Sequence, residues 1–506
     1  MQRWRALCLV VAAGLAVAAC GNGGTSNSGP PPHNNVLYYG TPGEPDSLDP
    51  GGGISGFDGY YLSFIYDTLV HTDPKTGNAE PGLATSWQFM GADKLTFQLT
   101  LRQGVKFQDG TPLDAQAVKT SLDHYRAGGI WGDLFPVSGE TVVDDHTLDI
   151  NLKAAYSPLP LVLAGRAGMI ISPTALQKEG KEFGRNPVGA GPYTFKSWQP
   201  GAEIDLSRFG EFWNPNAKPH FNGVTFKVIP DATAMNNAVQ TGQIDFAPLI
   251  TGNAGQIQAA RKSTRVNTRL VDVNGMAIIT TNNKVAPFNN VLVRRAVNMS
   301  VNRQALANAV EGPGVGKGPA WQFEAPDYWT YSKDLKDYKF DPAQAKQLLA
   351  QAGYPNGITV QICNFADPTA VQIEKQTMGQ AGINLEIKQE PVNACVAGLQ
   401  NATFPMVQIG WIGQASPYYT FQTMFGSTGT GSFGPYQNVD NLLNQIASTY
   451  TKQGQKPLFD ELNKTLFDQA PSVPLYYLVN VFSYNKRLHG LVADNSGAVR
   501  FDDASF

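Results

Sequence analysis

The stretch between residues 341 and 411 constrains the fold most, because its apolar residues switch repeatedly between helical and strand spacing. Asp341-Pro342 predicts the start of a helix and Gly353 predicts its end. Strands are predicted over 358–363, 383–389 and 405–411, and helices between them over 368–381 and 392–400. This β-α-β-α-β order predicts a parallel sheet with right-handed crossovers, and therefore an α/β fold.

Two of the four cysteines, Cys363 and Cys395, lie in this stretch. Cys363 ends one predicted strand and Cys395 follows the next, and neighbouring parallel strands end at the same edge of a sheet. Their Cα atoms can then come within the roughly 4.4–6.8 Å that a disulfide requires. We predict a Cys363–Cys395 disulfide, and a pair of buried free thiols is the alternative.

The first twenty residues have the pattern of a bacterial lipoprotein signal. Arg3 and Arg5 precede an uncharged apolar run over 6–19, which is shorter than the roughly 20 residues of a membrane-spanning helix. Residues 1–19 are therefore predicted to be a lipoprotein signal peptide and Cys20 the lipidated residue. An ordinary cleaved signal with a chance cysteine is the alternative. Residues 20–35 are rich in Gly, Ser, Asn and Pro and predict a flexible tether.

The charge balance argues against two classes of protein. The 506 residues carry 38 Lys and Arg against 41 Asp and Glu, a formal net charge of −3. Nucleic-acid binding and a basic helix on a membrane surface both require an excess of positive charge, so neither is expected. A chain of this length is long for one hydrophobic core, and two or three domains are expected.

The sequence lacks the motifs of the common secreted hydrolases. Its six histidines form no H-E-x-x-H pair for zinc, and no G-x-S-x-G elbow occurs. We therefore expect no enzymatic activity, no cofactor and no metal site. A secreted hydrolase is kept as a distant alternative, because the separation of two acidic side chains is a three-dimensional quantity.

A series of short motifs in collinear order closely resembles family 5 of the bacterial extracellular solute-binding proteins, which includes oligopeptide, dipeptide and nickel binders. The resemblance covers roughly residues 36–490, and Asn302-Arg303 stands where the family usually has Asp-Arg. The motifs include Tyr66-Asp67-Thr68-Leu69-Val70, Pro81-Gly82-Leu83-Ala84-Thr85-Ser86-Trp87, Gly189-Ala190-Gly191-Pro192-Tyr193, Gly242-Gln243-Ile244-Asp245, Val293-Arg294-Arg295-Ala296-Val297 and Val473-Pro474-Leu475-Tyr476-Tyr477.

This resemblance implies a two-lobed α/β fold of the periplasmic-binding-protein type (class II), with an extra subdomain inserted in the first lobe. Lobe I is expected to comprise 36–55, 186–270 and 476–506, the inserted subdomain 56–185, and lobe II 271–475. The chain is expected to cross between the lobes near 271–281 and 475–482. Relatives bind a ligand between lobes that close over it, which tells a permease that the site is occupied.

The resemblance also indicates where the ligand lies. Gly410 is expected to supply backbone groups and Trp411 an aromatic wall, with core packing as the alternative for Trp411. In peptide-binding relatives the third residue after this Trp is commonly an Asp that pairs with the α-amine of the peptide. Here that position is Gln414, a neutral acceptor. The other candidate ligand-binding residues are Tyr418, Tyr419, Tyr476 and Tyr477.

These features predict a lipid-anchored solute-binding protein of an ABC importer, on the extracytoplasmic face of the cell membrane. Short peptides or peptide-like molecules are the expected ligands, because the family binds them. An oligosaccharide or another uncharged solute is the alternative, which Gln414 and the aromatic residues favour. The expected partners are the permease subunits and, through them, the cytoplasmic ATPase subunits, and the protein itself is expected to be a monomer.

Overall fold

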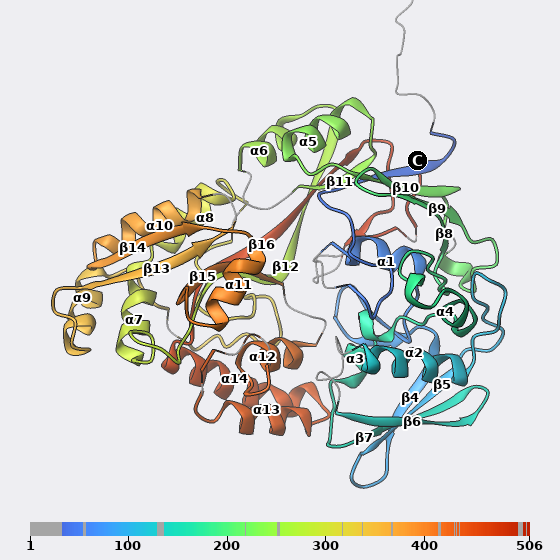
Figure 1. Ribbon diagram of the computed structural model, residues 1–506, viewed down its shortest axis with the longest axis horizontal. Helices are drawn as coiled ribbons and strands as arrows, with labels where there is room; N and C mark the ends of the chain where they lie inside the picture. Colours follow the sequence, from blue (N-terminus) through green and yellow to red (C-terminus); the bar gives the residue numbers. More distant parts are fainter. Residues whose placement is uncertain are drawn as a thin grey trace, which may run out of the picture. The chain divides into compact units, whose positions relative to one another are not determined.

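A ten-stranded mixed sheet is the largest element of the protein in this computed structural model (Figure 1). The structure describes residues 33–53, 57–128, 136–217, 219–249, 254–315, 317–335, 337–365, 368–412, 416–429, 431, 433–434, 436–493, 499–501 and 503–506. In order across the sheet, the strands are β14 (Ile383–Gln389), β13 (Ile358–Asn364), β15 (Met406–Ile412), β12 (Val266–Thr281), β16 (Ser472–Asn485), β11 (Phe246–Leu249), β1 (Val36–Thr41), β10 (Gly223–Val228), β9 (Glu203–Arg208) and β8 (Tyr193–Gln199).

One end of this sheet is the α/β unit predicted over residues 341–411. β13 pairs in parallel with both β14 and β15, and the connecting helices are α10 (Thr369–Gly379) and α11 (Val392–Gln400). α9 (Pro342–Gln351) precedes β13, and the Asp341 carboxylate accepts a hydrogen bond from Gln344 N at 2.9 Å. Gly353 follows this helix with a φ of 93°, a conformation that glycine adopts readily. The predicted order and the parallel pairing are confirmed.

β12 and β16, of 16 and 14 residues, connect this unit to the rest of the sheet. They pair antiparallel along most of their length, with an irregularity between Asp272 and Met276. β12 also pairs with β15, whereas β16 pairs with β11. Both chain crossings that were expected near 271–281 and 475–482 therefore lie on these two strands. The lobe boundaries drawn there stay a prediction.

The segment predicted to be an inserted subdomain contains its own four-stranded sheet, with the order β4-β5-β7-β6. α2 packs against β6 and β7 of this sheet. The elements of the segment are α1 (Gly59–Ile65), β2 (Val70–Thr72), β3 (Ala79–Pro81), β4 (Ala84–Met90), β5 (Thr96–Leu101), α2 (Ala115–Ala127), β6 (Val137–Asp144), β7 (Thr147–Leu152), α3 (Leu159–Val162), the 3-10 helix η1 (Arg166–Gly168), α4 (Pro173–Glu179) and the 3-10 helix η2 (Gly180–Glu182).

Gly189 and Gly191 let the chain pass closely by its own earlier backbone. Gly191 N donates a hydrogen bond to Ile65 O at 2.9 Å, and a Cβ atom on Gly191 would lie 2.6 Å from the Ile65 carbonyl carbon. A Cβ atom on Gly189 would lie 2.3 Å from Ile65 O. The glycines of this motif therefore permit a backbone contact that a side chain would prevent.

Two apolar clusters lie on opposite faces of β12 and β16. The first includes Val273 and Tyr476 and is covered by α7 (Val291–Ser300), α8 (Arg303–Val310), α9 and α10. The second includes Met276 and Tyr477 and is covered by α12 (Pro417–Phe425), α13 (Val439–Ala447) and α14 (Lys452–Gln469). We call the second the α12–α14 cluster; its buried members include Met276, Phe323, Phe421, Phe425, Leu442, Phe459, Leu462 and Tyr477. Adjacent strand residues thus face different clusters, as the strand period requires.

The folded part begins within the segment that was predicted to be a tether. Asn222 N donates to Asn35 O at 2.7 Å, and Asn35 Nδ2 donates to His220 O at 2.7 Å. Residues 33–35 are therefore part of the fold, and the tether prediction is corrected to end at residue 32. Residues 20–32, Cys20 among them, and the predicted signal peptide 1–19 lie outside the described residues.

Three further helices and two short strands complete the described fold. Within the described ranges, none of the helices combines the length and the hydropathy that crossing a bilayer requires. The elements are the 3-10 helix η3 (Pro215–Ala217), α5 (Ala232–Thr241), α6 (Ala254–Lys262), β17 (Val492–Ala493) and β18 (Val499–Arg500).

Candidate functional site

The two tyrosines of β16 point to opposite faces of the sheet. Tyr476 packs in the cluster under α7–α10, whereas Tyr477 packs in the α12–α14 cluster, and each is 4% exposed. Tyr477 Oη donates to Gln322 O at 3.3 Å. Burial raises the pKa of both phenols, so both stay neutral at physiological pH. Only Tyr477 therefore lies on the face that also carries the other candidate aromatic residues.

Trp411 lies near the end of β15, where it pairs with Met276 of β12. Its side chain is half-buried and packs against the α12–α14 cluster. The indole Nε1 is buried and has no hydrogen-bond partner among the described residues. Gly410 pairs with Ala277, and Gln414 lies outside the described residues. Trp411 thus combines partial core packing with an unused polar atom.

Tyr418 and Tyr419 lie in the first turn of α12, directly after Pro417. The Tyr418 ring contacts Tyr156, which lies in the predicted inserted subdomain, edge-on with 5.6 Å between the ring centroids. Burial raises the pKa of Tyr418 to about 12. It also raises the pKa of Tyr419, although a hydrogen bond with Thr423 partly offsets this increase. Tyr418, Trp411 and Tyr477 all pack against the α12–α14 cluster, so the structure brings these three predicted residues together.

Next to Tyr156, the segment predicted to be an inserted subdomain is hydrogen-bonded to α13 and α14. Ser157 N donates to Ala447 O at 2.8 Å, and Ser157 Oγ donates to Ile446 O at 3.2 Å. Gln455 Nε2 donates to Ser157 Oγ at 3.1 Å. The sequence gives no signal for this contact, because a lone serine near Pro158 has no distinctive pattern.

A second contact joins the same two regions through Lys452 of α14. Its Nζ donates to Asn78 Oδ1 at 2.5 Å and to Thr76 O at 3.4 Å. Phe89 and Tyr450 pack edge-on beside it, with ring centroids 4.7 Å apart. The contacts of Ser157 and of Lys452 thus both connect the predicted subdomain 56–185 to predicted lobe II. The Ser157 contact lies next to the ring contact between Tyr156 and Tyr418.

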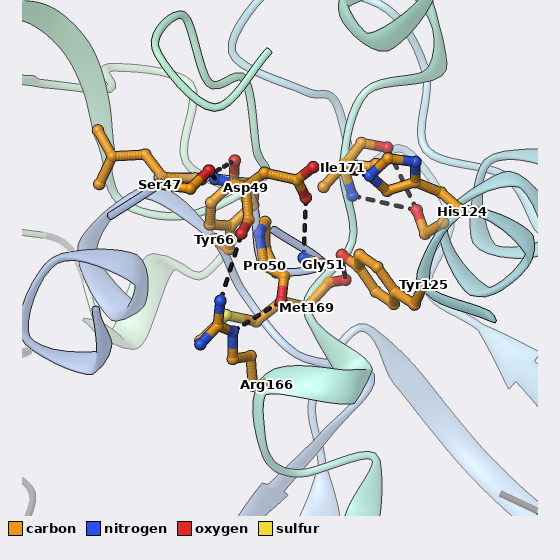
Figure 2. A network of polar contacts seen from close by, with 12 residues as sticks. Ser47, Asp49, Pro50, Gly51, Tyr66, His124, Tyr125, Arg166, Met169 and Ile171 are labelled. Carbon is orange, nitrogen blue, oxygen red and sulfur yellow. Dashed lines mark hydrogen bonds and ion pairs between the residues drawn. The ribbon is translucent and has the colours of Figure 1, made fainter. Parts of the chain in front are cut away.

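A partly buried polar network holds the chain segment that follows β1 (Figure 2). Asp49 Oδ2 lies 2.7 Å from His124 Nε2, and Gly51 N donates to Asp49 Oδ1 at 2.8 Å. Arg166 Nε donates to Pro50 O at 2.6 Å, and Arg166 Nη1 lies 3.2 Å from Asp58 Oδ2. These contacts tie the segment to α2 and η1.

The pKa shifts of the ionisable groups in this network follow from their burial and from their contacts with one another. The hydrogen bond with Asp49 raises the pKa of His124, which favours the protonated imidazole as its donor. Burial raises the pKa of Asp58, and the charge of Arg166 acts in the opposite direction. The contacts given above join members of the network to one another or to backbone, and they position the segment that follows β1.

Cys363 and Cys395 are joined by a disulfide, with 5.5 Å between the Cα atoms. Cys363 lies in β13 and Cys395 in α11, and both are fully buried beside Val407 of β15. The bond therefore connects two elements that flank the strand carrying Trp411.

The chemistry offered at the candidate site is aromatic stacking and hydrogen bonding. Trp411 and Tyr418 are partly buried and present ring surface that can pack against apolar groups or sugar rings, whereas Tyr477, at 4% exposed, supports them from within the cluster. In the part of the chain that the structure describes, no three His, Cys, Asp or Glu side chains converge as they would around a metal ion.

Comparisons with known proteins agree with this picture. A sequence profile described as bacterial extracellular solute-binding proteins, family 5 Middle, matches residues 78–433. The glutathione-binding protein GsiB of Salmonella typhi is 30% identical over 437 residues, which cover 81% of this chain and 83% of that protein.

Solved structures show the same fold. The periplasmic binding protein DppA from Helicobacter pylori, in complex with the peptide STSA, superimposes with a TM-score of 0.82 at 24% identity, covering 93% of this chain and 98% of that one. The dipeptide binding protein from Pseudoalteromonas sp. SM9913, in complex with Met-Leu, gives 0.81 at 20% identity, covering 93% and 99%. The predicted two-lobed α/β fold of the periplasmic-binding-protein type is confirmed.

Proposed function

Because the chain belongs to family 5 of the bacterial extracellular solute-binding proteins, we propose that it is the lipid-anchored binding component of an ABC importer and takes up short peptides or peptide-like ligands. Proteins of this family bind solutes for transport and are not enzymes. The observation that carries the ligand class is the similarity over more than four-fifths of the chain to a glutathione-binding protein, since glutathione is itself a peptide-like molecule. The peptide complexes of DppA and of the dipeptide binding protein agree with it.

The contacts between the inserted segment and α12–α14 supply a physical basis for closing over a ligand. Tyr156 on Tyr418 and Ser157 on Ala447 join residues that lie 262 and about 290 positions apart in the sequence, so they depend on the tertiary arrangement. A ligand that binds better when these contacts are formed shifts the equilibrium toward the closed state. In this proposal the permease subunits then recognise the closed, monomeric protein.

The ligand class can be tested on the purified mature chain. A mixture of tri- and tetrapeptides at a hundredfold excess over Kd should raise the free energy of unfolding by about 2.7 kcal/mol, because the ligand binds only the native state. Thermal unfolding with and without the mixture measures the effect, and mass spectrometry identifies peptides that co-purify. Maltooligosaccharides serve as the comparison. Stabilisation by the sugars and none by the peptides would replace the peptide proposal with the uncharged-solute alternative.

The anchor is tested separately in cells. Replacing Cys20 with alanine should move the protein from the membrane fraction to the soluble extracytoplasmic fraction, because a lipidated cysteine supplies the acyl chains that hold it to the bilayer. Incorporation of radiolabelled palmitate should disappear in the same variant. Cys8→Ala is the matched control, since Cys8 lies inside the predicted signal peptide. A Cys20→Ala protein that stays labelled and membrane-bound would contradict the proposed anchor.

A further inference from the structure

The described part of the chain begins at His33, which is held against the end of α5. His33 Nε2 lies 3.2 Å from Gly242 O, and its ring packs on Tyr38 with 4.4 Å between the ring centroids. The same nitrogen lies 3.8 Å from Asp245 Oδ1. The segment predicted to connect the fold to Cys20 therefore joins the protein beside Gly242 and Asp245.

Three basic residues lie on one side of this point, at the end of α6. Ser263 Oγ donates to Gln240 Oε1 at 3.4 Å, which holds the end of α6 beside the end of α5, and the two helices lie side by side (Figure 1). Arg261 and Lys262 are the last two residues of α6, and Arg265 follows before β12 begins. All three side chains are exposed.

A fourth basic residue lies on the other side, at the end of β16. Asn485 N donates to Asp245 O at 2.7 Å, so this end of β16 also reaches the surroundings of His33. Val266 of β12 pairs with Asn485 in antiparallel register. Arg265 precedes the one strand and Lys486 follows the other, so these two residues leave the sheet next to each other.

The four residues form a local excess of positive charge, which we call the basic patch. Their side chains are exposed and take part in no ion pair or hydrogen bond within the part of the chain that the structure describes. The sequence contains no Asp or Glu over 246–271 or over 469–493, and Asp245 is buried. The expectation from the net charge of −3 concerned the whole chain and does not describe this patch. Its members are Arg261, Lys262, Arg265 and Lys486.

The basic patch ends at Arg487. The guanidinium carbon of Arg487 lies 5.9 Å from the centre of the Phe506 ring. Asp503 is exposed and lies beside Gly490, where an added Cβ atom would be 2.0 Å from Asp503 O. An exposed acid therefore lies on this side, and Arg487 is not counted in the patch.

We propose that the basic patch binds the anionic phospholipid headgroups of the membrane to which Cys20 is anchored. This inference rests on the proposed lipid anchor and adds an orientation to it, with the ends of α5 and α6 toward the bilayer. Guanidinium and ammonium groups carry the charge and the hydrogen-bond donors that phosphate oxygens accept. Anionic lipid surfaces attract such residues strongly within a Debye length, about 8 Å at physiological ionic strength.

The length of the chain between anchor and fold favours this contact. The 13 residues from 20 to 32 span at most about 45 Å even when fully extended. A lipid on Cys20 therefore keeps His33, and the basic patch beside it, close to the membrane surface. Because the anchor makes the encounter intramolecular, a modest attraction is enough to select the orientation.

The same position favours a membrane over an acidic partner protein. The anchor brings the bilayer to this end of the protein at all times, with or without a ligand or a permease. A partner protein has no such reason to meet the residues next to His33. The described contacts thus single out the lipid surface as the occupant of the basic patch.

Cosedimentation with protein-free lipid vesicles tests the proposal. The mature chain carrying Cys20→Ala is used, so that acylation does not contribute. In about 0.1 M salt it should bind vesicles with about 30% phosphatidylglycerol about a hundredfold more tightly than vesicles of phosphatidylcholine alone. Each Lys or Arg near an anionic surface strengthens binding about fivefold, so three such residues account for this preference. In about 1 M salt the preference should vanish, because the Debye length falls to about 3 Å.

Two triple variants separate the position of the charges from the net charge. The patch variant carries Arg261→Gln, Lys262→Gln and Arg265→Gln, and its binding to the anionic vesicles should fall about a hundredfold. The control variant changes the net charge equally through exposed lysines of α9, α10 and β14, and its binding should equal that of the parent chain. Its substitutions are Lys346→Gln, Lys375→Gln and Lys388→Gln.

The outcomes separate this inference from the function on which it rests. Equal binding of the parent chain to both kinds of vesicle, or an equal loss in the two triple variants, would overturn the basic patch as a membrane contact. Binding through the patch to native membrane vesicles, with none to protein-free anionic vesicles, would assign it to a partner protein and overturn the proposal as well. Failure of the peptide or palmitate experiments would contradict the proposed function and leave the vesicle result unchanged.

Discussion

Replacing Arg303 with methionine is expected to lower the free energy of unfolding by about 4 kcal/mol. The side chain is 3% exposed and donates to Pro474 O at 2.6 Å, Asn298 O at 2.7 Å and Asn298 Oδ1 at 2.8 Å. Burial lowers the pKa of Arg303 to about 10, so it remains a charged donor at neutral pH. Methionine fills a similar volume but donates nothing, and each buried acceptor left without a donor costs about 1–3 kcal/mol.

Urea unfolding followed by circular dichroism measures this loss, and a neighbouring arginine provides its control. Arg295 is half-buried and donates to Asp468 O near the surface. Arg295→Met should therefore cost no more than about 1 kcal/mol, because water can replace its hydrogen bonds. A loss below about 1 kcal/mol for Arg303→Met as well would show that the buried carbonyl groups find other donors.

The hydrogen bonds of Arg294 and Arg303 give a structural role to two motifs that were first matched only to the family. Arg294 donates to Gln469 O and Ala470 O, just before β16, and Arg303 donates to Pro474 O within it. Two arginines of α7 and α8 therefore fasten the start of the strand that carries Tyr476 and Tyr477. Their role is to position the strand, and they do not belong to the binding surface.

Removal of the disulfide is expected to lower the free energy of unfolding by about 3–4 kcal/mol, because a bond between cysteines separated by 32 positions restricts the unfolded chain. The double replacement Cys363→Ala and Cys395→Ala tests this by urea unfolding. Alanine is chosen because both sites are fully buried and a serine hydroxyl there would need a partner. Reduction of the wild-type protein should produce the same loss.

Two controls make the disulfide test specific. Reducing agent should not change the stability of the double variant, since it has no bond left to break. A thiol count on the non-reduced, denatured mature chain carrying Cys20→Ala should find no free thiol. Two free thiols would restore the alternative of buried cysteines that are not bonded.

Several local features of the fold were predictable from the sequence because they depend on neighbours along the chain. Asp341 caps α9 through the amide of Gln344, three residues away, and glycine after the helix adopts a positive φ. The strands over 358–412 alternate apolar side chains with the period that a sheet imposes, and the helices between them predicted their parallel order. Gly189 and Gly191 stand in a motif that the sequence analysis quoted, and the Ile65 backbone occupies the space that their missing side chains leave.

The candidate site was predicted less completely. Trp411, Tyr418 and Tyr477 meet around one cluster, but Tyr476, which is their equal in sequence, lies on the other face of β16. Adjacent strand residues point to opposite sides of a sheet, so only one of these two candidates can lie on the face of Trp411 and Tyr418. Which one it is depends on which helices cover each face.

The sequence by itself determined the kind, order and pairing direction of the elements around residues 341–411, because those follow from periodicity and caps acting over a few residues. Only the tertiary structure decided which distant polar groups become neighbours: Asn274 beside Glu324, Ser157 beside Ala447, and Arg303 beside Pro474. Burial then gives these pairs their energetic weight, since a buried charge or carbonyl group must find its partner within the protein. Such partners lie dozens to hundreds of residues apart and have no local pattern.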